Sequence, residues 1–197
     1  MNENGKPKLV VFASGSAEGG GSGFEKLIEA SFSGVLNAEI VAVVSNHVNG
    51  GVRLRADKLS IPFIHFPKPW TAEKYQEIAT ETKADFFALS GWLKLVTGLD
   101  PSTNFNSRTV FNVHPGLLPE FGGAGMYGHH VHEAVVEAYK EGSTKYSGVS
   151  MHFVDEEYDR GPIFARIKVL IEDNDTGETL GSRVNAIEHR HQPIITN

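Results

Sequence analysis

Cysteine is absent from the 197 residues of the chain. Its absence excludes disulfides, thiolate nucleophiles and cysteine-ligated zinc. Long apolar runs are absent too, since none approaches the roughly 18 to 20 residues that span a bilayer. The first residues, Met1 to Lys8, are polar and lack the apolar stretch of a signal peptide. We therefore expect a cytoplasmic protein without a membrane partner, in which residues 1–8 form a flexible tail.

Positive charge is in short supply. Lysine and arginine number 18 against 24 acidic residues, which gives a net charge of −6 at pH 7. This balance would repel a phosphate-rich polymer, so we expect no nucleic-acid partner, although a local basic pocket would still suit one small anion. The length and the hydrophobic content of 40% fit one domain over residues 1–197, either as a monomer or as a homodimer.

Apolar runs without alternation recur in the first half of the chain, and they are typical of strands buried on both faces of a parallel sheet. We predict such strands at residues 9–13, 39–45, 62–66, 85–89 and 109–113, with helices at 24–31 and 71–83 and a short helix within 50–60. The rhythm then changes to a helix at 127–140, consecutive strands at 146–154 and 163–171, and a closing helix at about 176–189. The order predicts an α/β fold with a mostly parallel central sheet flanked by helices and antiparallel strands in its C-terminal part.

A glycine-rich loop, SGSAEGGGSG at 14–23, follows the first predicted strand and precedes a helix. Backbone N–H groups in such a loop could cradle a phosphate at the helix N-terminus. The pattern is neither the dinucleotide-binding fingerprint nor the P-loop. On glycine content alone, a flexible surface loop is an equally good interpretation.

Asn112-Val113-His114-Pro115 ends the fifth predicted strand. Residues two apart on a strand face the same side, so Asn112 and His114 project together. Pro115 stops the strand at the edge where ligands usually bind in α/β sheets. A carboxamide beside an imidazole suits stabilisation of an oxyanion combined with proton transfer. For an isolated Asn-x-His, a hydrogen-bonded histidine at a strand end would be the preferred interpretation.

An acidic loop, DEEYDRG at 155–161, separates the last two predicted strands. Within this loop Asp159 precedes a turn that could hold its carboxylate rigidly. Asp159 becomes a candidate catalytic residue only if the fold brings it close to His114. Asp155, Glu156 and Glu157 are interpreted as a solvated rim.

Three histidines, His129, His130 and His132, lie near the start of a predicted helix. Two of them are three residues apart, but the HExxH zincin spacing is missing and no cysteine is available. We interpret them as capping or packing residues near the site and expect no metal.

The chain resembles the glycinamide ribonucleotide formyltransferase family in five segments that keep their order over nearly the whole length. They are LVVFASGS with GSGFEKLIEA, SGWLKLV at 90–96, FNVHPGLLPEFGGAGMYGHHVHEAV at 111–135, SGVSMHFVDEEYDRGPIF at 147–164 and DTGETLGSRVNAIEHRHQP at 175–193. The resemblance implies the Rossmann-like formyltransferase fold. It also implies an enzyme that binds small molecules, with 10-formyltetrahydrofolate as the co-substrate and formyl donor, and no metal.

The resemblance assigns roles by position. Asn112 and a protonated His114 would stabilise the oxyanion, and Asp159 would support the charge on His114 and take part in removing the amine proton. Gly21, Ser22 and Gly23 would hold the substrate phosphate, and Glu188, otherwise an exposed helix residue, would bind the ribose. The folate pocket would be formed by Leu93, Lys94, Leu95 and Val96 together with the main chain of Val154, Asp155, Glu156, Glu157 and Tyr158.

The sequence departs from the family pattern in places. The glycine loop is longer than usual, Gly23 stands where asparagine is common, and Lys94 stands where arginine is frequent. Rival functions are transfer to another amine acceptor on the same fold, hydrolysis of 10-formyltetrahydrofolate, and non-catalytic nucleotide binding. The resemblance at Glu188 and the Ser22 loop favours a ribose phosphate acceptor over the first two, and the presence of Asn112, His114 and Asp159 disfavours the third.

Overall fold

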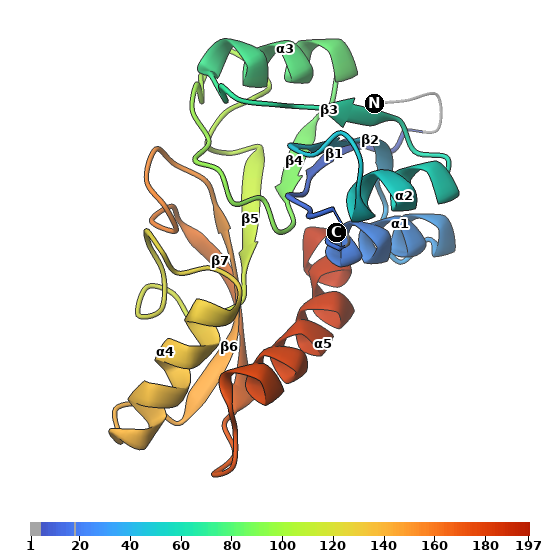
Figure 1. Ribbon diagram of the computed structural model, residues 1–197. Helices are drawn as coiled ribbons and strands as arrows, with labels where there is room; N and C mark the ends of the chain where they lie inside the picture. The colour runs from blue at the N-terminus through green and yellow to red at the C-terminus, as the bar shows by residue number, and fades with distance from the viewer. Residues whose placement is uncertain (1–4, 18) are drawn as a thin grey trace.

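One seven-stranded sheet organises the computed structural model, which describes residues 5–17 and 19–197 (Figure 1). The strand order is β3-β2-β1-β4-β5-β6-β7. Strands β1 to β5 pair in parallel, and β6 and β7 are antiparallel. This arrangement confirms the predicted α/β fold. The strands are β1 Lys8–Phe12, β2 Glu39–Ser45, β3 Phe63–His65, β4 Phe86–Leu89, β5 Val110–His114, β6 Tyr146–Phe153 and β7 Ile163–Leu170.

Helices cover both faces of the sheet. They are α1 Ser22–Ser33, α2 Gly51–Lys58, α3 Ala72–Thr82, α4 His129–Lys140 and α5 Gly177–Thr196. Buried side chains of α1, α2, α4 and α5 belong to one hydrophobic core, and those of α3 belong to a second core on the other side of the sheet (Figure 1). None of the helices formed by the described residues is long and apolar enough to cross a membrane.

Strand β1 shows why its sequence is apolar without alternation. Leu9 and Val11 pack into the first core, whereas Val10 and Phe12 pack into the second. Successive side chains of a strand point to opposite faces, so a strand covered on both faces needs apolar residues at every position. Polar residues are therefore expected beyond the ends of the central strands and not within them.

The boundaries of some elements differ from the prediction. Residues 1–4 of the predicted tail lie outside the described residues, and Lys8, the last tail residue, is the first residue of β1. Ser22, predicted to lie in the loop, is the first residue of α1.

Helix α5 continues to Thr196 instead of ending near His189. Pro193 lies inside it, a position that normally interrupts a helix because proline lacks an N–H. Gln192 and Pro193 are buried, so tertiary packing supports the extra turns.

Candidate active site

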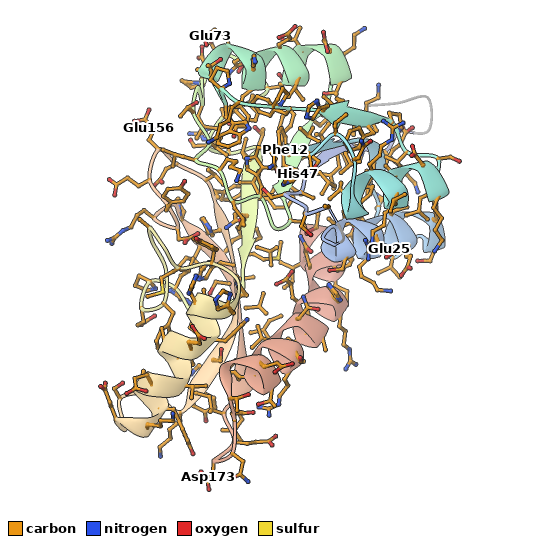
Figure 2. The ribbon with its side chains drawn as sticks, viewed as in Figure 1. Phe12, Glu25, His47, Glu73, Glu156 and Asp173 are labelled. Atoms are coloured by element: carbon orange, nitrogen blue, oxygen red, sulfur yellow. The ribbon has the colours of Figure 1, made fainter. Side chains whose placement is uncertain are left out.

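A cavity of about 420 Å³ lies where β4 and β5 end, at the edge predicted to bind ligands. All three residues of the predicted catalytic set line it. Its walls also include Leu93, Lys94, Leu95, Val96, Val154, Asp155, Glu157, Tyr158, Asn185 and Glu188. The described lining of this cavity does not include four of the predicted site residues, which are Glu156, Gly21, Ser22 and Gly23. Figure 2 shows Glu156 on the loop between β6 and β7.

The carboxylate of Asp159 lies at the centre of the polar cluster. One oxygen, Oδ2, accepts a hydrogen bond from the backbone N–H of Gly123 at 3.0 Å and lies 3.5 Å from Nδ1 of His114. The other oxygen, Oδ1, lies 3.4 Å from Nε2 of His152 and 3.4 Å from Nδ2 of Asn112. Burial raises the pKa of Asp159, but these hydrogen bonds and the neighbouring imidazoles together hold it below its ordinary value. Asp159 is therefore an anion in the site.

His114 sits between two acceptors. Its Nε2 lies 2.6 Å from the carbonyl oxygen of Phe121, and its Nδ1 faces Asp159. A neutral imidazole carries one N–H and can donate to only one of these oxygens, whereas an imidazolium satisfies both. Burial, with only 3% of the residue exposed, nevertheless lowers the pKa of His114, and Asp159 and the Phe121 carbonyl oppose that shift. The site can therefore hold His114 neutral and still stabilise a proton that arrives during reaction.

His152 on β6 completes the cluster and is not among the site residues predicted from the sequence. The antiparallel register pairs it with Asn112, and its Nε2 lies 3.1 Å from Nδ2 of Asn112. Its Nδ1 lies 2.8 Å from the carbonyl oxygen of Phe153. His152 contacts both the Asn112 carboxamide and the Asp159 carboxylate through Nε2, so it lies where it can orient both groups. The available signal was a histidine near the end of the strand that leads into the acidic loop, seven positions before Asp159.

The acidic loop holds Asp159 in a strained backbone conformation. Its φ of 57° lies in the left-handed region that few side chains adopt. Two residues later, a Cβ on Gly161 would lie 1.9 Å from the carbonyl oxygen of Phe153. Glycine at this position therefore lets the loop return against β6 and aim Asp159 into the cavity.

Gly161→Ala is expected to destabilise the fold by about 2 kcal/mol or more, because the new methyl collides with backbone that cannot rotate away. Urea unfolding measures the difference. Gly19→Ala is the control, since its methyl would lie at an ordinary 3.5 Å from Ser16 Oγ. Equal stability of wild type and Gly161→Ala would show that the loop relaxes freely.

Glu188 on α5 reaches the cavity wall. Burial alone raises its pKa to about 7, and no described charged group opposes the shift. A carboxylate held without a partner at a cavity wall is a candidate acceptor for ligand hydroxyl groups.

The raised pKa of Glu188 makes it a source of instability at high pH. Below the ordinary value of 4.5 the group is protonated in both folded and unfolded chains, so it has no effect. Between that value and about 7 the unfolded chain ionises more readily, so folding stability falls and stays reduced above pH 7. We expect Glu188→Gln to match wild type near pH 4 and to be more stable, by up to about 3 kcal/mol, near pH 8. Unfolding at both pH values tests this, and equal stability at pH 8 would contradict it.

The glycine loop lies beside the cavity rather than in its wall. Ser14 Oγ accepts from the N–H of Leu93 at 3.0 Å, and Ser22 Oγ lies 3.2 Å from Nε2 of His189. A Cβ on Gly23 would lie 2.2 Å from Ser90 Oγ, so this residue allows α1 to pack against the end of β4.

The histidines near α4 separate into two groups. His132 is buried and lines the cavity, and its Nδ1 has no hydrogen-bond partner among the described residues. His129 and His130 are exposed with Glu133, and one ligand atom from each lies within 4.8 Å of the others. His129, His130 and Glu133 could therefore together supply ligand atoms to a metal ion.

Comparisons with known proteins show the family of the chain. A family model described as formyl transferase matches residues 7–195. The chain is 38% identical to phosphoribosylglycinamide formyltransferase, chloroplastic, of Arabidopsis thaliana over 96% of its own length, and it spans 64% of that relative, which is less than two thirds. It is 31% identical to phosphoribosylglycinamide formyltransferase of Bacillus subtilis, covering 95% of this chain and 92% of that one. The crystal structure of phosphoribosylglycinamide formyltransferase from Bacillus halodurans matches with a TM-score of 0.79 at 31% identity, covering 96% and 93% of the two chains.

Proposed function

The chain belongs to the formyl transferase family, and from that premise we propose that it transfers the formyl group of 10-formyltetrahydrofolate to the amine of 5-phosphoribosyl-glycinamide. The products are N-formylglycinamide ribonucleotide and tetrahydrofolate, as a step of purine synthesis. The observation that carries the proposal is the cluster of Asn112, His114 and Asp159 in one cavity. The names of the Arabidopsis and Bacillus relatives support the choice of acceptor.

The chemistry assigned to the cluster is acyl transfer. The substrate amine attacks the formyl carbon, and the carbonyl oxygen becomes an oxyanion on a tetrahedral intermediate. The Asn112 amide and the imidazolium of His114 stabilise that oxygen, and Asp159 stabilises the charge on His114. The amine nitrogen loses a proton, N10 of the folate gains one, and the bond between the formyl carbon and N10 breaks. Removing one such oxyanion donor typically lowers the rate by a hundredfold to a thousandfold.

Two parts of the site are assigned to the two substrates. The folate is assigned to the wall that Leu93, Lys94, Leu95 and Val96 form together with the chain from Val154 to Tyr158. Nζ of Lys94 lies 4.8 Å from the centre of the Trp70 ring. The ribonucleotide is assigned to the side of α5 and α1, with its ribose at Glu188 and its phosphate at Gly21, Ser22 and Gly23, where the glycine loop meets α1. The first turn of a helix offers unpaired N–H groups for that phosphate.

Donor consumption measured by absorbance tests the acceptor. Loss of 10-formyltetrahydrofolate that requires glycinamide ribonucleotide supports the proposal. Equal loss with water as the sole acceptor would assign the chain to hydrolysis. Turnover only with an amino-sugar nucleotide or an aminoacyl-tRNA would assign it another acceptor.

A further inference from the structure

The glycine loop rests on the N-terminal turn of α2. A Cβ on Gly51 would lie 2.5 Å from the carbonyl oxygen of Gly19, and one on Gly50 would lie 2.3 Å from that of Ser16. The backbone N–H of Gly51 also donates to the Ser16 carbonyl at 3.4 Å. The loop therefore follows the surface of α2 in backbone contact, although its composition is compatible with free motion.

Arg55 on α2 links three parts of this region. Its Nη1 donates to the carbonyl oxygen of Gly20 at 2.8 Å and to that of Gly51 at 3.3 Å. Its Nε donates at 2.9 Å to Glu25, which lies in the first turn of α1 (Figure 2). The side chains of Arg55 and Glu25 are 31% and 22% exposed, so solvent screens this pair only in part. One guanidinium thus joins the loop, α1 and α2.

The bond to the Gly20 carbonyl fixes an entire peptide unit. In a planar trans peptide the C=O and the following N–H point in opposite directions. Because the Gly20 carbonyl accepts this hydrogen bond from Arg55, it points towards α2, and the N–H of Gly21 points away from α2. Gly20 and Gly21 both have positive φ, at 94° and 81°, and glycine pairs reorient readily without such a restraint.

We propose that Arg55 is a positioning residue that holds the Gly20–Gly21 peptide in the orientation needed to bind the substrate phosphate. The proposal rests on the function inferred above, in which the loop takes the phosphate of the ribonucleotide. Glu25 supports the role because it holds Nε while Nη1 reaches the loop. The matched residue Arg53, on the same helix, pairs with Asp57 at 2.9 Å on the exposed side and lies over the Phe63 ring, away from the loop.

Kinetics with two acceptors test the proposal. Arg55→Met is expected to lower kcat/KM for glycinamide ribonucleotide about 10- to 100-fold, the effect of one charge-assisted hydrogen bond, mainly through KM. The same variant should leave kcat/KM for glycinamide riboside, which lacks the phosphate, within about twofold of wild type. Arg55→Lys should be intermediate, and Arg53→Met should match wild type. Equal losses with ribonucleotide and riboside would overturn the proposal, because they would indicate general damage to the fold.

Glu25→Gln separates positioning from simple charge attraction. If Arg55 positions the loop, a weaker Glu25 contact raises KM for the ribonucleotide. If nearby charge alone sets phosphate affinity, removal of an acidic group lowers KM, and that result would contradict the proposal.

Calorimetric titration with inorganic phosphate needs no turnover, so weaker binding by Arg55→Met than by Arg53→Met supports the proposal even if the ribonucleotide is not the acceptor. Equal phosphate affinity of the two variants would overturn it.

Discussion

Asp159→Asn should lower kcat by about a thousandfold, within the range expected for loss of one member of a proton-transfer pair. The substitution keeps the shape of the side chain and removes its charge. The carboxylate accepts from Gly123 and faces both His114 and His152. An amide cannot stabilise an imidazolium at His114, and its NH₂ group would meet groups that donate to Asp159. Stopped-flow or steady-state donor consumption measures the loss.

The pH dependence of Asp159→Asn gives a second readout. Asp159 is the largest influence that raises the pKa of His114 against burial. Without it that pKa falls further, so the titration due to His114 should move to lower pH in the variant. Asp57→Asn, on the exposed side of α2, is the control and should leave both rate and profile unchanged. An unshifted profile in Asp159→Asn would show that the carboxylate does not act through His114.

His114→Ala is expected to lower kcat/KM by about a hundredfold to ten-thousandfold, because it removes both the positive charge that stabilises the oxyanion and the group that carries a proton. The titration assigned to His114 should disappear from the pH profile of any residual activity. His65→Ala, an exposed histidine on the edge strand β3, is the matched control. Retention of more than a tenth of the activity by His114→Ala would contradict its role in the reaction.

Much of the fold and part of the candidate site could be predicted from sequence because they depend on local rules. The apolar runs of β1 and β2 correspond to strands buried on both faces. Asn112 and His114 lie together because they are two apart on one strand, and that strand ends at the cavity. The part of Asp159 depends on the fold, which brings its carboxylate to 3.5 Å from His114.

The remaining features depend on contacts between distant segments. His152 meets Asn112 only through the antiparallel register of β5 and β6, which no local pattern specifies. Pro193 lies inside α5 because burial outweighs the lost hydrogen bond. The role of Arg55 depends on how α2 packs against the loop, and its sequence context is an ordinary charged helix. Tertiary packing therefore decided the features that local propensity left open.

Transfer of an isotopic label tests the central proposal most directly. The enzyme would be given 10-formyltetrahydrofolate labelled with ¹³C in the formyl group, together with glycinamide ribonucleotide, and the products analysed by mass spectrometry. We expect the label on the ribonucleotide in amounts equal to the donor consumed, with no transfer in Asp159→Asn on the same timescale. Label recovered as free formate, at a rate that does not depend on the ribonucleotide, would contradict direct transfer to the amine.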